Sequence, residues 1–479
     1  VDNTQILILS SIVMPFIGAA LNIIFHRWEN LRDLLTLTTA IFTFAFVVLV
    51  VTAFNDGKKI DFSLLTVVPG LEIAFNVEPL GLLFGVVASG LWIITHLYAI
   101  GYMRGNDEKH RARFFACFSI AIGTVLGLAF SKNLFTLFIF YEVLTLSTFP
   151  LVAHKGTPEA LRGAKAYLKI LLGTSVGLQL IAIISVYIFA GTLDFTPQGI
   201  LAGKVTNFQA SVLLALFAFG IGKAALMPFH KWLPAAMVAP TPVSALLHAV
   251  AVVKAGVFTI LKVGVYIFGI DFLKESGSSN WLIWLAAFSI LSASVVAMTK
   301  DNLKARLAYS TISQLSYITL GLAIANSLGV LGGALHIATH ALGKITLFMC
   351  AGSIYVATHR TKVSELNGLG RIIPFTFGAF LKSSGFTIWQ SFSSTFFAFA
   401  LPGQFVMADL LIAGGSILNI FFAVLLTNAR LFPMTINLIP IIKNNKIPKW
   451  KLFLISHLIA VTAWINMFAS YENVKKNNR

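Results

Sequence analysis

Apolar runs of about 20 residues recur along this whole chain, and they constrain its folding more than any other feature. A helix needs about 20 mostly apolar residues to cross a bilayer. Of the 479 residues, 57% are hydrophobic and 11% are charged, and the mean hydropathy is +0.85. Soluble domains carry roughly 25% charged residues. The sequence therefore predicts an all-α, polytopic protein embedded in a lipid bilayer.

The apolar runs predict about fourteen transmembrane helices. One of them, 209–238, is interrupted, because it contains Gly220, Gly222, Pro228 and Pro234. Proline frees a backbone carbonyl, and a break of this kind survives in a membrane only where protein or a water-filled cavity covers it. The expected helices cover about 5–25, 32–54, 79–103, 112–129, 131–153, 164–190, 209–238, 241–266, 280–300, 303–325, 327–356, 373–400, 405–430 and 450–470.

The strongly basic charge balance has a simple explanation in a membrane protein. The net charge is +17, from 35 Lys and Arg against 18 Asp and Glu. Basic residues collect in cytoplasmic loops, and with the N-terminus outside, most loop Lys and Arg fall on the inner side. No stretch matches a nucleic-acid motif, so we expect no nucleic-acid partner.

Cofactor chemistry has no visible basis in this sequence. Cys117 and Cys350 both lie in apolar runs and are too few for a disulfide framework or an iron–sulfur cluster. The stretch 343–346 lacks the upstream glycine of a P-loop. We expect no cofactor, no metal, no catalytic residue and no redox centre of the chain's own. The first apolar run has no basic flank or small-residue cleavage site, so we expect no cleaved signal peptide.

Ionisable residues inside the predicted helices point to ion movement. A charge at the bilayer centre costs roughly 2.5–3.5 kcal/mol, so such residues are usually functional. Glu142 lies mid-helix, and Lys223 directly precedes the helix break. A desolvated lysine can accept and release a proton. The alternatives are a fixed ion pair for Glu142 and extension of Lys223 to the interface.

His336, His340 and Lys344 follow a spacing of i, i+4 and i+8. This spacing puts them on one helix face over about 12 Å, which is typical of a proton relay. Satisfied core histidines or a metal pair are the alternatives, and the absence of an accompanying Cys or carboxylate disfavours a metal. Lys254, midway along its helix together with His248, is interpreted as a bridge between two halves of the path.

Charges near helix ends have weaker interpretations. Lys169 and Lys262 are expected to extend to the interface. Asp409 begins its helix and either faces an outer exit or lies at the interface.

The expected segments are 1–111 with three helices, a first five-helix repeat over 112–266, a second over 267–431, and a last helix and tail over 432–479. An odd number of spans per unit inverts the second repeat, as in transporters.

Several stretches together resemble a known family. They are 133–142, 222–223 with 228–234, 239–248, 301–311 and 340–344. Over about 75–385 the chain is similar to the antiporter-like membrane subunits shared by Mrp-type cation/proton antiporters and respiratory complex I, and it is most similar to the D-type member of the Mrp antiporters.

The resemblance implies fourteen helices with two inverted five-helix repeats. It also implies that Glu142 pairs with Lys223, that Lys254 links two half-channels, and that His336 and His340 continue a polar axis. The expected function is proton conduction by one subunit of a multi-subunit Na⁺/proton antiporter in the bacterial inner membrane, with other membrane subunits as partners. The alternative is a proton-pumping subunit of an NADH-quinone oxidoreductase or a membrane hydrogenase.

The chain departs from the family at the twelfth helix. The family has a proline-containing break and a following lysine there, whereas 375–401 contains no proline. Only Lys382 is available, near the start of that helix, so Lys382 and Asp409 are the candidates for an exit site. A displaced exit, a lost exit and a gene-level error all stay open, and a lost exit implies a non-conducting, structural subunit.

Overall fold

The computed structural model describes residues 3–68, 70–246 and 250–366. The chain forms two compact units, Val1–Lys362 and Val363–Arg479. The described part of the second unit holds one short 3₁₀ turn, η6 (Val363–Glu365). The first unit, described below, carries the candidate site.

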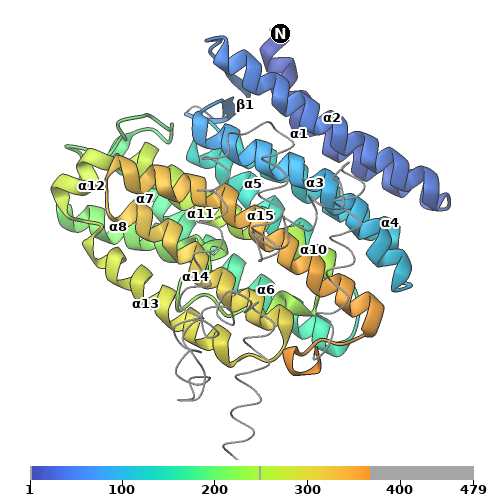
Figure 1. The fold of residues 1–479 in the computed structure, drawn as a ribbon. Helices are drawn as coiled ribbons and strands as arrows, with labels where there is room; N and C mark the ends of the chain where they lie inside the picture. Colours follow the sequence, from blue (N-terminus) through green and yellow to red (C-terminus); the bar gives the residue numbers. More distant parts are fainter. Residues whose placement is uncertain (1–2, 69, 247–249, 367–479) are drawn as a thin grey trace, which may run out of the picture. The chain divides into compact units, whose positions relative to one another are not determined.

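The N-terminal part consists of three long helices and one hairpin (Figure 1). Helices α1 (Asn3–Ile24) and α2 (Glu29–Asn55) pack against each other, and the antiparallel strands β1 (Asp61–Val68) and β2 (Leu71–Asn76) lead to α3 (Pro79–Gly105). Proline at the first position of α3 suits a helix start. The three helices were predicted; the hairpin, with its β-branched end at 66–68, was not.

Side-chain caps mark two of the next three helix starts. Helix α4 (Arg111–Ala129) leads to α5 (Leu134–Val152), whose N-cap Asn133 accepts from the Thr136 N–H at 2.8 Å. Thr157 caps α6 (Pro158–Thr174), which continues through the π-helical turn η1 (Ser175–Gln179) into α7 (Leu180–Ala190). This span starts six residues before its predicted start, because Pro158 occupies its first position.

The predicted interruption of 209–238 is confirmed. Helix α8 (Asn207–Gly220) ends before the 3₁₀ turn η2 (Gly222–Ala224). The one-turn helix α9 (Trp232–Ala235) and the 3₁₀ turn η3 (Ala236–Val238) follow a cis peptide before Pro228. The backbone therefore leaves α-helical geometry at Ile221, and Lys223 lies within the break.

The remaining described elements surround one central helix. Element α10 (Thr241–Leu246) precedes α11 (Val252–Val263), which packs against α3, α4, α5, α8, α14 and α15. The π-helical turn η5 (Gly264–Phe268) continues α11, and the short α12 (Ile270–Ser276), which was not predicted, is bent by 79° from them. Helices α13 (Asn280–Thr299), α14 (Leu303–Ala323) and α15 (Ser327–Thr358) complete the unit (Figure 1).

The described helices have the surface of a membrane protein. Eight of them are long and apolar enough to cross a bilayer, and the bent pair from Val252 to Ser276 allows a ninth span. Helix α13 exposes large apolar side chains at helical spacing, including Trp284, Phe288 and Leu291. The predicted helices 373–400, 405–430 and 450–470 lie outside the described residues, so the total of fourteen and the two inverted repeats remain predictions.

Candidate functional site: a buried Lys–Glu–His path

Lys223 is fully buried at the helix break and is held by α5. Its Nζ donates to the backbone carbonyl of Tyr141 at 2.7 Å and to Thr145 Oγ1 at 2.6 Å. The same Nζ lies 3.1 Å from the centroid of the Tyr141 ring, and the Lys223 backbone N–H donates to the Tyr141 hydroxyl at 3.1 Å. Two acceptors and an aromatic face stabilise an ammonium here.

Glu142 follows Tyr141 in α5, so its carboxylate starts one residue from the lysine's acceptors. Both carboxylate oxygens are shielded from solvent and have no hydrogen-bond partner among the described residues. No ion pair within 4.0 Å joins Glu142 to Lys223 in this part of the chain. The structure therefore places the two residues side by side, but the Lys223 ammonium is hydrogen-bonded to Thr145 and not to the Glu142 carboxylate.

Glycine allows α11 to approach the break closely. A Cβ on Gly256 would lie 2.2 Å from the Ala224 nitrogen and 2.3 Å from the Lys223 carbonyl carbon. A side chain at this position would therefore displace the η2 backbone. Because Gly256 lies two residues after Lys254, the same helix carries the next buried lysine of the path.

Lys254 connects α11 to α15. It is fully buried, and its Nζ forms a short hydrogen bond with His340 Nδ1. The rings of His340 and His336 lie parallel, with centroids 5.7 Å apart. On the next turn, Lys344 donates to Ser310 Oγ at 2.8 Å and to the Leu307 carbonyl at 3.2 Å. One face of α15 thus presents three titratable groups along the unit.

Three candidate site residues, His248, Lys382 and Asp409, lie outside the described residues. Lys169 is exposed, which fits its extension toward the interface. Within the described ranges, no group of three His, Cys, Asp or Glu side chains is arranged to hold a metal ion.

The interpretation of Lys262 was wrong. This lysine is buried, not extended to the interface, and its Nζ pairs with Glu78 Oε1 at 2.7 Å. It also donates to the Ser131 carbonyl at 2.8 Å and faces the Phe195 ring at 4.7 Å. The pair ties α11 to the start of α3. No local sequence pattern reveals this pair, because Glu78 is remote from Lys262 along the chain.

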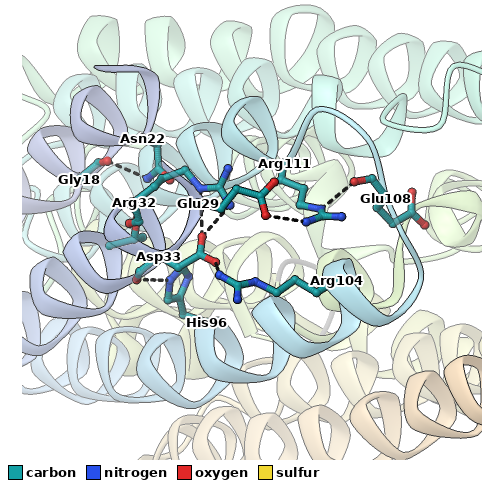
Figure 2. A network of polar contacts seen from close by, with 10 residues as sticks. Gly18, Asn22, Glu29, Arg32, Asp33, His96, Arg104, Glu108 and Arg111 are labelled. Carbon is teal, nitrogen blue, oxygen red and sulfur yellow. Dashed lines mark hydrogen bonds and ion pairs between the residues drawn. The ribbon is translucent and has the colours of Figure 1, made fainter. Parts of the chain in front are cut away.

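A second polar cluster, also missed, joins α2 to α3 (Figure 2). Asp33 accepts from Arg32 at 2.7 Å and from Arg104 at 2.5 Å, and its carbonyl oxygen lies 3.2 Å from His96 Nε2. Arg111 reaches from α4 to Glu29 at 2.9 Å. Arg32 and Asp33 begin the predicted helix 32–54, whereas α2 begins three residues earlier at Glu29 and buries both of them. The charges of this cluster are mutually paired, which suits a structural role.

Comparison with known families settles the class of protein. The family model for the transmembrane part of "NADH:quinone oxidoreductase/Mrp antiporter" matches residues 131–400, more than half of the chain. This chain belongs to that family. The model for the N-terminus of complex I chain 5 matches 69–115. The resemblance inferred from the sequence motifs is confirmed, and the chain is a multi-pass membrane protein.

Individual relatives come from both branches of the family. The "NAD(P)H-quinone oxidoreductase chain 5" of a Picosynechococcus species is 31% identical over 329 residues, covering 65% of this chain and 48% of the relative. A "Probable K(+)/H(+) antiporter" chain of Rhizobium meliloti is 32% identical over 311 residues, covering 64% of this chain and 30% of the relative. The chain thus spans about a third to a half of these relatives.

A solved Mrp complex from a Dietzia species has a similar fold. The TM-score is 0.62 at 25% identity, and the similarity covers 73% of this chain and 37% of that one. A membrane-bound sulfane sulfur reductase gives the same TM-score at 21% identity, which shows the fold alone.

The end of the chain also matches a different family model. The model of the AzlC protein covers 371–478 and overlaps the antiporter match over 371–400. This match begins eight residues after the second compact unit starts. It also begins just before 375–401, where the sequence departs from the family's proline-containing helix.

Proposed function

We propose that this chain is the proton-conducting membrane subunit of a multi-subunit, Mrp-type Na⁺/proton antiporter. The observation that carries the proposal is the hydrogen bond between Lys254 and His340, which lies between the Lys223 cluster on one side and His336 on the other. Buried ionisable groups in membrane helices mark ion pathways. Here they come from α5, η2, α11 and α15, and α11 contacts each of the other three.

In this mechanism, Lys223 alternates between two partners. In one position its ammonium donates to Thr145 and to the Tyr141 carbonyl, as the structure has it. In the other position it pairs with Glu142. Movement of the positive charge changes the field at Lys254, because α11 contacts the η2 backbone through Gly256. Low-dielectric surroundings strengthen that coupling.

Proton transfer then proceeds along α11 and α15. The Lys254 ammonium releases a proton to His340 Nδ1, which leaves a neutral amine and an imidazolium. The imidazolium releases the proton from Nε2 toward His336 and Lys344, directly or through water. His248 is proposed to join this path on the Lys254 side, and Lys382 and Asp409 are proposed exit groups.

The cation, partners and location belong to the same proposal. We expect Na⁺ to be exchanged, other membrane subunits to complete the assembly, and the assembly to lie in the bacterial inner membrane. Relatives named as chains of antiporters and of oxidoreductases support a multi-subunit context.

The test uses everted membrane vesicles that contain the complete assembly. A Na⁺ pulse should dissipate an imposed pH gradient in wild-type vesicles, and Glu142→Ala or Lys223→Ala should abolish this response while assembly persists. Lys169→Ala is the matched control, because Lys169 is exposed. Wild-type responses in the Glu142 and Lys223 variants would refute the proposal.

A second candidate is a proton-pumping subunit of an NADH-quinone oxidoreductase or membrane hydrogenase. The 31% identity to the Picosynechococcus oxidoreductase chain favours it. The same side chains would move protons, but a redox partner would drive them. Co-purification decides: iron–sulfur or quinone-binding proteins support this candidate, and cation-antiporter proteins support the first.

A third candidate is a structural subunit that does not conduct. The AzlC match over 371–478 favours it, because it falls where the family's distal proton site is expected. For this candidate, wild-type assemblies would form normally and carry no proton flux in the vesicle assay.

A further inference from the structure

A cavity of about 200 Å³ lies among the inner ends of several helices, apart from the buried proton path. The end of α3, the loop after α5, the start of α10, the start of α14 and the end of α15 all contribute to its walls. The positive-inside distribution of basic residues puts this end of the unit at the inner membrane surface.

The cavity wall carries three cations and no carboxylate among the described residues that line it. The cations are Lys155, Lys304 and Arg360. Lys304 Nζ donates to the Ala239 carbonyl at 2.5 Å, and Lys155 Nζ lies 5.7 Å from the Tyr355 ring centroid. These contacts hold the two lysines at the wall. Like charges around one space repel one another, and an anion between them would relieve this repulsion.

Two further features suit an anion. Helix α14 is 21 residues long, and it begins at the cavity wall with Leu303 and Lys304, so the positive end of its dipole lies there. The hydroxyls of Thr241 and Tyr102 also belong to the wall and lie 3.4 Å apart. Hydroxyl groups can donate to the non-ester oxygens of a phosphate.

We propose that this cavity binds the phosphate of an anionic lipid headgroup from the inner leaflet. Basic pockets between transmembrane helices on the cytoplasmic side are suited to such headgroups. Arginine can contact two phosphate oxygens at once, and lysine supplies a point charge. The exposed Lys155 and Arg360 are accessible from the surface, whereas Lys304 is more buried. The proposal holds whether or not the chain conducts protons.

Lipid retention tests this proposal on the purified assembly. Native mass spectrometry after exchange into phosphatidylcholine nanodiscs doped with phosphatidylglycerol should show retained phosphatidylglycerol on the wild type. The double variant Lys155→Gln/Arg360→Gln should weaken this retention at least ten-fold. The control is Arg162→Gln/Lys165→Gln, which removes the same charge from exposed positions on α6 and should retain lipid as the wild type does.

Three outcomes would overturn the proposal. Equal retention by both double variants assigns the lipid to another surface. Displacement by millimolar inorganic phosphate, without any preference for phosphatidylglycerol over phosphatidylcholine, assigns the cavity to free phosphate. If the double variant does not assemble, a photoreactive phosphatidylglycerol is applied to the wild type. Labelled peptides should then include 155 or 304, and labelling confined to other segments excludes the site.

Discussion

Thr145 provides the sharpest test of how Lys223 is held. Thr145→Val keeps the shape of the buried side chain and removes one of the two oxygen acceptors of the ammonium. A hydrogen bond to a charged group contributes roughly 1.5–3 kcal/mol. The variant therefore biases Lys223 away from its observed position by about that amount, and one step of its alternation slows by roughly 10- to 100-fold.

The assay is the Na⁺-driven dissipation of a pH gradient in vesicles that hold the complete assembly. Thr148→Val is the matched control, since Thr148 is equally buried one turn further along α5 but donates to the Leu144 carbonyl and contacts Tyr167. Its transport should stay within about threefold of the wild type. Thr145→Ser should restore the lost rate. Wild-type transport by Thr145→Val would show that this hydroxyl does not hold the lysine during turnover.

Three further predictions concern stability, measured by thermal unfolding of the purified assembly. Gly256→Ala should lower stability by about 1–3 kcal/mol through its clash with η2. Gly343→Ala is the control, because a Cβ at Gly343 meets nothing within 4 Å, and its stability should not change. Equal effects of the two substitutions would contradict the close packing at Gly256. Glu78→Gln leaves Lys262 buried without its ion pair and should lower the stability by about 3–5 kcal/mol. The double variant Glu78→Gln/Lys262→Met should recover most of this loss. Unchanged stability of the single variant would show that the pair is unimportant. Burial, with a smaller contribution from nearby positive charge, lowers the pKa of His154 to about 4. The unfolded chain binds this proton near pH 6.5, so lowering the pH from about 6.5 to 4 should destabilise the wild type by up to about 3 kcal/mol relative to His154→Gln, and parallel pH profiles would contradict this shift.

The sequence predicted the long elements well, for identifiable physical reasons. Helices α4 and α13 begin and end within one residue of expectation, because their apolar runs stop at charged or turn-forming residues. The break at η2 was predictable, since Pro228 and Pro234 cannot continue a helix. The hairpin β1–β2 and α12 were missed because they are too short to give a membrane-span pattern.

The candidate site was predictable only in part. Spacing alone placed His336, His340 and Lys344 on one face, because helical periodicity fixes that relation. The partners of Lys223 could not be found this way, since one of them is a backbone carbonyl that carries no sequence signal. Thr145, which lies one turn after Tyr141 in α5, was the one available hint.

Lys262 shows the limit of judging a charge by its position along one helix. Lys262 lies near the end of its predicted helix, which suggested an interfacial side chain, but the start of α3 and the loop before α5 cover it. Tertiary packing decided its environment, and no local pattern contains that information.

Proton flux through Lys254 tests the central claim most directly. The purified assembly would be reconstituted into liposomes, and flux would be measured with an enclosed pH-sensitive dye for Lys254→Met, His340→Asn and the double variant. If the two residues act in series, as their hydrogen bond indicates, each single variant should reduce the flux at least ten-fold and the double variant should be no worse than the poorer single one. Wild-type flux in Lys254→Met, in a fully assembled complex, would contradict the account.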